Sequence, residues 1–209
     1  GQTQEDVRKT IEIAAGSGAK HISMYALQPE DGTPIYTDYL NGELPDGDEV
    51  AALYDFGRDL LAQKGYHRYE VSNFCKKGFE SRHNLNYWRR GEYVGMGVSA
   101  SSFFSGRRLL NTTDLDEYMK CILSGFYPVI DSEEVFPKDA RFEFVMLGLR
   151  TVFGVSSKKY EEEFGSDWKQ DFSAAYHRTK KYLEEQGDIT RIKDEYLFVQ
   201  NQILSEYAD

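Results

Sequence analysis

The chain has 209 residues, a mass of 24.1 kDa and a formal net charge of −10, from 35 acidic and 25 basic residues. Apolar residues make up 40% of it and aromatic residues 14%, which is enough to build a hydrophobic core and excludes a mainly disordered chain. No apolar run approaches the ~20 residues that a membrane-spanning helix needs, and the acidic balance argues against nucleic-acid binding led by phosphate neutralisation.

The two cysteines, Cys75 and Cys121, lie far apart in the sequence. A secreted disulfide framework needs more cysteines than this, and an iron–sulfur cluster needs three or four cysteine ligands. A single disulfide between them is an open alternative, but a reduced, cytoplasmic protein is the expectation.

The first third of the chain alternates helical and extended patterns. Apolar residues at helical spacing predict helices over residues 4–15 and 48–64, and alternating residues predict strands over 20–27 and 66–74. Residues 29–47 are rich in turn formers and read as a loop. A helix followed twice by a strand predicts a parallel sheet with crossover helices.

The middle of the chain predicts a glycine-rich hairpin. Residues 94–104 read as a strand and residues 107–111 as its return strand, joined by a Ser-Gly turn. Thr113 is the predicted cap of a helix that ends at Gly125, and residues 126–132 read as a connector.

The last third predicts three helices and a hairpin. Pro137 opens the first helix, Ser156 caps the second and residues 172–183 form the third. Residues 189–199 alternate around Lys193-Asp194 as a hairpin. Three helices followed by a hairpin resemble a winged helix.

A basic trio on the third of these helices raises the question of DNA binding. Arg178, Lys180 and Lys181 lie where a DNA-reading helix would sit. Residues 139–209 hold 14 acidic and 10 basic residues, however, which is the wrong balance for duplex binding. We therefore expect no nucleic-acid partner.

The hexapeptide His83–Trp88 is the richest cluster of chemical groups. It holds an imidazole, two amides and two large aromatic rings. A neutral imidazole is the commonest axial ligand of haem iron, and flanking aromatic rings can cover a flat macrocycle. The alternative is a loop histidine bonded to backbone, with Tyr87 and Trp88 in the core.

Three other stretches could line a site. Small residues over 95–101 allow a ligand to approach the backbone, or mark a tightly packed strand. One face of the strand over 20–27 carries His21, Ser23 and Tyr25, and Gln28 and Glu30 follow its carboxyl end. Binding sites of α/β proteins lie at such strand ends. The alternative is an ordinary strand whose histidine is hydrogen-bonded within the fold and whose glutamate is solvated.

Within residues 69–74, Glu70 and Ser72 share a face. A glutamate buried in a sheet needs a partner, and the alternative is a solvated edge strand.

Several stretches occur together, and in this order, in a known family. They are Gly1–Thr3, His21–Tyr25 with Glu30–Thr33, Tyr69–Phe74, His83–Trp88, and Gly95–Ser101 with Arg108 and Asn111. The chain resembles the oxygen-independent coproporphyrinogen III oxidase-like radical SAM proteins, and within them the haem chaperone branch. Residues 142–151 and the hairpin at Gly187 resemble the family's C-terminal domain. The resemblance covers the whole chain but only about the C-terminal half of a family member.

The resemblance implies an α/β fold in which the C-terminal part of a partial (β/α) radical SAM barrel is followed by a small α+β, winged-helix-like domain. We expect the boundary to divide residues 1–125 from residues 126–209. Residues 21–28 would be the last barrel strand. Because the chain opens on a helix cap with no strand before it, we expect the natural protein to extend beyond Gly1, with the family's CxxxCxxC motif for a [4Fe–4S] cluster in that upstream part.

The resemblance also implies site residues. The HNxxYW pattern of the chaperone branch is implicated in haem binding, and it is matched here by His83, Asn84, Tyr87 and Trp88. His83 is the expected ligand of the haem iron. The glycine-rich stretch resembles the strand close to S-adenosylmethionine. The residues expected near that cofactor are Tyr25, Glu30, Gly95, Gly97, Ser99 and Ala100.

Three functions follow as hypotheses. The first is a cytoplasmic radical SAM protein that binds haem and passes it to haem-requiring proteins; this stretch alone, without cluster ligands, is expected to be inactive. The second is the oxidase that decarboxylates two propionates of coproporphyrinogen III. The third is a non-catalytic interaction module, suggested by the winged-helix-like tail.

Overall fold

The computed structural model describes residues 1–208. Its helices and strands follow one another as α1 (Gln4–Gly16), β1 (His21–Ser23), α2 (Pro34–Leu40), α3 (Gly47–Gln63), β2 (His67–Arg68), β3 (Asn73–Cys75), α4 (Arg82–Trp88), β4 (Ser101–Phe104), β5 (Arg107–Asn111), α5 (Leu115–Leu123), β6 (Val129–Glu134), α6 (Pro137–Leu149), β7 (Val155–Ser156), α7 (Ser157–Phe164), α8 (Trp168–Asp171), α9 (Ser173–Thr179), η1 (Lys180–Tyr182), β8 (Leu183–Gln186), β9 (Ile189–Ile192), η2 (Asp194–Val199) and α10 (Gln200–Ser205). Among them, no helix combines the length and apolar character needed to cross a bilayer.

Within residues 1–208 the strands form three small sheets, ordered β1-β3-β2, β4-β5-β6 and β7-β9-β8. Every pairing in them is antiparallel, so the parallel sheet predicted for the first third is wrong. The segment predicted as one strand over 66–74 is in fact two short strands that reverse direction between Arg68 and Asn73. The returning strand β3 is the one that pairs with β1, which places Ile22 opposite Phe74.

The N-terminal core lies between α1, α3 and the first sheet. Thr3 caps α1 as predicted, because its hydroxyl accepts from the amide of Asp6 while the Asp6 carboxylate accepts from the amide of Thr3. Gly57 of α3 allows the close approach of Met24, whose sulfur would lie 2.7 Å from an added Cβ. The buried residues of this core are Val7, Ile11, Leu60, Leu61, Tyr66 and Phe74.

The middle unit is the sheet β4-β5-β6 with α5 at one end. The predicted strand over 94–104 is confined to β4, because Gly97 (φ 113°) and Ser99 (φ 57°) leave the extended conformation. The predicted connector over 126–132 is wrong, since β6 pairs with β5 there. Asp114, not Thr113, caps α5 by accepting from the amide of Glu117.

The C-terminal unit has the largest core, which includes the fully buried Trp168, Tyr160 and Tyr207. Pro137 opens α6 and Ser156 caps α7, as predicted. The third predicted helix, over 172–183, is shorter than expected: α9 covers Ser173–Thr179, η1 continues it as a 3-10 turn to Tyr182, and Leu183 already begins β8. The hairpin turns between β8 and β9 at Gly187, not at Lys193-Asp194, so residues 194–199 are helical.

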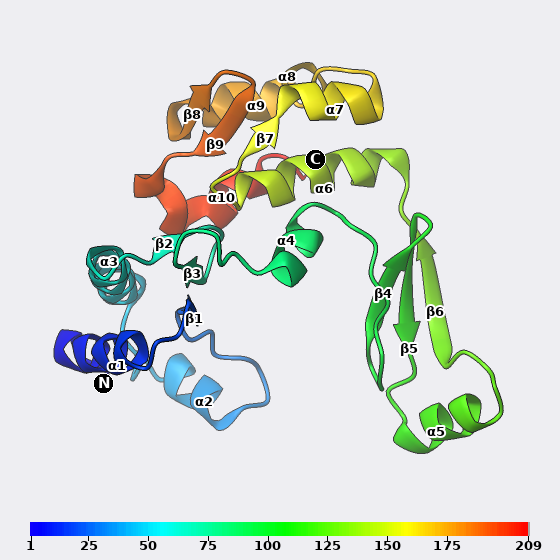
Figure 1. Cartoon of the computed structure of the whole chain (residues 1–209), viewed down its shortest axis with the longest axis horizontal. Helices are drawn as coiled ribbons and strands as arrows, with labels where there is room; N and C mark the ends of the chain where they lie inside the picture. Colours follow the sequence, from blue (N-terminus) through cyan, green and yellow to red (C-terminus); the bar gives the residue numbers. More distant parts are fainter. Residues whose placement is uncertain (209) are drawn as a thin grey trace.

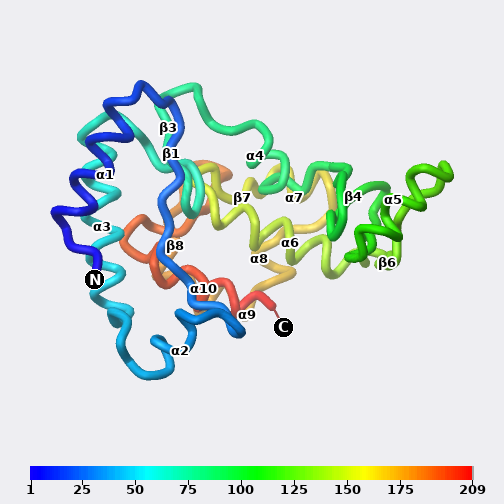
Figure 2. The backbone as a smooth tube through the Cα atoms, turned by 90° about the horizontal axis from the view of Figure 1, so that it is seen from below, coloured from blue at the N-terminus to red at the C-terminus, as the bar shows by residue number. Residues whose placement is uncertain are grey.

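The three units lie around the short helix α4 (Figure 1). The N-terminal helices lie on one side, the sheet β4-β5-β6 on the other, and the C-terminal unit spans between them, as the view turned by 90° also shows (Figure 2). The carboxylate of Glu143 in α6 accepts from Arg90 (3.4 Å) after α4 and from Arg108 in β5. Arg90 also donates to Glu163 of α7 (2.6 Å). This ion cluster joins α4 and the middle sheet to the C-terminal unit.

Candidate functional site

The HNLNYW hexapeptide forms the helix α4. Ser81 caps the helix by accepting from the amide of Asn84, and Leu85 is buried. Leu85 lies in a small core with Tyr69 and Cys75, against which Trp88 packs. These inward contacts fix which face of the helix is left for solvent.

The outward face carries His83 and Tyr87. His83 is exposed, and the Tyr87 side chain is 39% exposed. The Tyr87 hydroxyl lies 3.1 Å from Nε2 of His83, and the two rings meet edge to face with their centres 4.8 Å apart. The imidazole is therefore reachable by a ligand, and the alternative of a histidine committed to backbone is wrong for this residue.

Two other side chains of the hexapeptide, those of Asn84 and Trp88, face inward. The side-chain amide of Asn84 donates to the Tyr69 hydroxyl at 3.3 Å, and the same hydroxyl lies 2.9 Å from Nε2 of His21 on β1. Burial raises the pKa of Tyr69, so its hydroxyl keeps its proton. Asn84 and Trp88 thus fix the helix, while His83 and Tyr87 present its exposed groups.

The backbone of the glycine-rich stretch before β4 is held by hydrogen bonds to side chains and to neighbouring backbone. The amides of Gly95, Gly97 and Ser99 donate to the Ser102 hydroxyl (3.0 Å), the Tyr118 hydroxyl (3.0 Å) and the Thr112 carbonyl (2.9 Å) respectively. The side-chain amide of Asn111 in turn donates to the carbonyl of Gly97 at 2.9 Å.

In addition, the Ala100 amide donates to the Gly97 carbonyl at 3.4 Å. The side chain of Met96 in this stretch is 89% exposed.

The structure does not bring the two groups of expected cofactor residues together. Tyr25 and Glu30 are exposed in the segment between β1 and α2, on the side of the N-terminal helices. Gly95, Gly97, Ser99 and Ala100 precede β4 on the opposite side (Figures 1 and 2).

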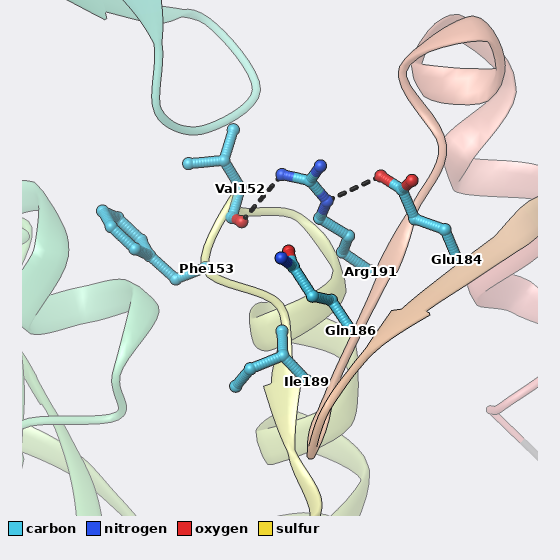
Figure 3. A pocket seen from close by; sticks show the side chains of 6 residues that line it. All are labelled: Val152, Phe153, Glu184, Gln186, Ile189 and Arg191. Carbon is cyan, nitrogen blue, oxygen red and sulfur yellow. Dashed lines mark hydrogen bonds and ion pairs between the residues drawn. The ribbon is translucent and has the colours of Figure 1, made fainter.

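One cavity of about 270 Å³ lies in the C-terminal unit (Figure 3). Its arginine is already paired, since Arg191 donates to Glu184 at 2.6 Å and to the carbonyl of Val152 at 3.5 Å. The six lining residues are Val152, Phe153, Glu184, Gln186, Ile189 and Arg191. None of the expected site residues lines it.

Comparison with known proteins supplies the family. Residues 135–198 match the HemN C-terminal domain family. The chain is 35% identical over 167 residues to Heme chaperone HemW of Bacillus subtilis (strain 168), an alignment that covers 79% of this chain and 44% of that protein. It is 38% identical over 167 residues to Heme chaperone HemW of Lactococcus lactis subsp. lactis (strain IL1403), covering 78% of this chain and 43% of that protein.

A solved structure agrees in fold. The coproporphyrinogen III oxidase (HemN) from Escherichia coli, described as a radical SAM enzyme, matches 99% of this chain and 52% of its own with a TM-score of 0.75 at 15% identity. The chain belongs to the HemN-like family, on the match of its C-terminal part to the HemN C-terminal domain and its identity to the HemW proteins. It spans less than half of the length of the two HemW relatives and corresponds to the C-terminal part of the family.

The residues of this HemN-like chain do not fit an iron–sulfur cluster. Cys75 is buried and Cys121 is partly buried, and both are free thiols. Burial raises the pKa of Cys75, which disfavours the thiolate that a cluster requires. Across residues 1–208 no group of three or more His, Cys, Asp or Glu side chains is arranged to hold a metal ion.

Sequence reasoning missed two aromatic residues beside α4. Tyr69 belongs to a motif that predicts no partner for it, and the structure places its hydroxyl between His21 and Asn84. Tyr93 belongs to no motif, and its ring packs edge to face on Tyr87 with centres 4.6 Å apart. Neither contact has a signal in the spacing, because 15 and 6 residues separate the partners along the chain.

Proposed function

We propose that the full-length protein to which this chain belongs is a haem chaperone, and that His83 binds the iron of the haem it carries. The observation that carries the proposal is the exposed imidazole of His83, presented with Tyr87 on a helix whose other face is buried. Imidazole, in its neutral form, is the commonest axial ligand of haem iron. Two relatives named Heme chaperone HemW, at 35% and 38% identity, support the same function.

The cofactors belong to the same proposal. We assign the [4Fe–4S] cluster to the part of the full-length protein upstream of Gly1, since the cysteines here do not fit it. S-adenosylmethionine would be bound by that part together with side chains near Gly95–Ala100. Haem-requiring proteins are the proposed acceptors, and the cytoplasm is the proposed location.

The oxidase function is the less supported candidate. Its support is the likeness to the Escherichia coli enzyme, and at 15% identity this likeness shows the fold alone. We therefore expect no decarboxylated product when the full-length protein is incubated anaerobically with coproporphyrinogen III and S-adenosylmethionine.

The test of haem binding is a spectroscopic titration of this chain with ferric haem. We expect a shifted Soret band in the parent chain and its loss in His83→Ala. His67 on β2 is also exposed, so His67→Ala is the matched control and should bind as the parent does. Equal spectra and affinities for His83→Ala and the parent would remove His83 from the proposal. Far-ultraviolet circular dichroism checks that each variant is folded.

A further inference from the structure

The side chains of His83 and Tyr87 contact each other in this structure. They lie one helical turn apart on α4, a spacing that puts two side chains side by side. The Tyr87 hydroxyl is 3.1 Å from Nε2 of His83, and the ring planes are 86° apart. This is hydrogen-bond distance, whichever of the two groups donates the proton.

The tyrosine is held in that position from its other side. The Tyr93 ring packs edge to face on Tyr87 with centres 4.6 Å apart. Tyr93 is itself fixed to the sheet, because its amide donates to the carbonyl of Phe103 at 2.8 Å and its carbonyl accepts from the amide of Phe103 at 3.0 Å. Tyr87 is thus positioned by the sheet β4-β5-β6 and not by α4 alone.

The contact uses the nitrogen that iron needs. Each imidazole nitrogen offers one position in the plane of the ring, which holds either a proton or a lone pair. If Tyr87 donates, the lone pair of Nε2 is engaged, and if Nε2 carries the proton, it has no lone pair for a metal. The other nitrogen, Nδ1, lies next to the histidine's own backbone, which leaves less room for a planar macrocycle. Haem therefore has to displace the Tyr87 hydroxyl.

We propose that Tyr87 is a competitor of haem for His83: its hydroxyl takes the place of the iron at Nε2, so that it weakens haem binding and speeds haem release. The inference rests on the proposed role of His83. Tyr87 is then not a ligand of the iron: its hydroxyl leaves Nε2 of His83 when haem binds and returns when haem leaves. Because both groups project from the same face of one helix turn, they cannot bind opposite faces of the same haem.

Tyr87→Phe tests the competition directly, because it removes the hydroxyl and keeps the ring that packs on Tyr93. The probe is ferric haem, followed by Soret titration and by the rate of haem transfer to apomyoglobin. Losing one exposed hydrogen bond predicts binding that is about three- to tenfold tighter, with a correspondingly slower release. The Soret position should be that of the parent in both ferric and ferrous haem, because the iron ligand is unchanged.

Two controls separate this inference from the proposed function. Tyr127 is 92% exposed, so Tyr127→Phe removes a hydroxyl elsewhere and should leave haem affinity unchanged. In a double-mutant cycle, Tyr87→Phe should not raise haem affinity in a His83→Ala background, because that background has no imidazole nitrogen for the hydroxyl to block. A rise in haem affinity that persists in that background overturns the competition.

The remaining outcomes are equally decisive. If Tyr87→Phe binds haem with unchanged or lower affinity while His83→Ala loses it, the competition is wrong and the role of His83 stands. A ferric spectrum that changes in Tyr87→Phe identifies the tyrosine as a ligand, which also overturns it. If His83→Ala binds haem as the parent does, the proposed function itself fails.

Discussion

The Tyr69 hydroxyl lies 2.9 Å from Nε2 of His21, which joins the first sheet to the helix that carries His83. The same hydroxyl accepts from the side chain of Asn84 at 3.3 Å, and the backbone carbonyl of Tyr69 accepts from the amide of Val152 at 3.1 Å. Tyr69 is 2% exposed. One residue therefore ties together β1, α4 and the loop that follows α6.

Tyr69→Phe should destabilise the protein without changing its fold. The substitution keeps the ring in its core and removes two hydrogen bonds, so that the amide of Asn84 loses its partner. We expect the free energy of unfolding to fall by about 1–2 kcal/mol. Urea denaturation followed by tryptophan fluorescence measures it.

The matched control for Tyr69 is Tyr25→Phe, because that side chain is 73% exposed. It should leave the urea midpoint where it is. A Tyr69→Phe midpoint equal to that of the parent would show that the hydroxyl does not stabilise the contact between β1 and α4, and that the ring alone positions α4.

Local signals in the sequence were enough to predict many of the helices. Thr3 with Asp6 and Ser156 with the amide of Lys159 form side-chain caps at the expected places, and Pro137 opens α6. Each of these features depends on residues within one turn, so neighbouring residues decide it.

Features that depend on distant residues were not predictable in the same way. The alternation over 66–74 fits one long strand as well as two short ones. The antiparallel pairing of Arg68 with Phe74 shows that the chain reverses, and the returning strand then places Phe74 opposite Ile22 of β1. The outward position of His83 likewise depends on Leu85 meeting Tyr69. Its residue type indicated haem chemistry, but the competing Tyr87 hydroxyl is visible only once the helix is built.

Gly95 is required by packing, independently of any ligand. A Cβ at this position would lie 2.2 Å from the carbonyl oxygen of Ser101, which is backbone and cannot move aside cheaply. We expect Gly95→Ala to lower the free energy of unfolding by about 1–3 kcal/mol. Thermal unfolding measures the change.

Gly106 provides the comparison for Gly95. It has a φ of 70° with open space around its Cβ position, and asparagine tolerates that conformation. Gly106→Asn should therefore change the free energy of unfolding by no more than about 0.5 kcal/mol. If both variants are equally stable, the tight approach of Gly95 to Ser101 is not a constraint in solution.

Glu143 links the C-terminal unit to the middle sheet and to the end of α4 through ion pairs. Its side chain is 12% exposed and accepts from Arg90 and Arg108, and Arg90 is 11% exposed. Glu143→Gln removes the charge that pairs with Arg108 and one of the two carboxylates that pair with the nearly buried Arg90, so we expect a loss of about 1–3 kcal/mol of unfolding free energy in urea denaturation.

A surface pair in the same sheet calibrates the Glu143 measurement. Arg107 and Glu134 are 3.9 Å apart with side chains 46% and 62% exposed. Glu134→Gln should change stability by about 0.5 kcal/mol or less, because water and salt screen exposed pairs. Similar losses for Glu143→Gln and Glu134→Gln would mean that burial adds nothing to the ion cluster.

Tyr176 in α9 gives the C-terminal unit a defined response to alkaline pH. Burial, followed by the hydrogen bond that its hydroxyl donates to Glu185 at 2.5 Å, raises the pKa of Tyr176 from 10.0 to about 12. The unfolded chain therefore loses this proton first as the pH rises. The stabilisation is complete below pH 10 and is lost as the pH approaches 12.

We expect the free energy of unfolding of the parent to fall across that interval through this residue. Tyr176→Phe should be less stable at neutral pH, because Glu185 loses a donor, but its stability should fall less steeply between pH 10 and 12. Tyr39→Phe, at a side chain 55% exposed, should keep the slope of the parent. Lysine and arginine titration is common to all three proteins, so the difference in slope isolates Tyr176. Parallel pH profiles for the parent and Tyr176→Phe would contradict the raised pKa.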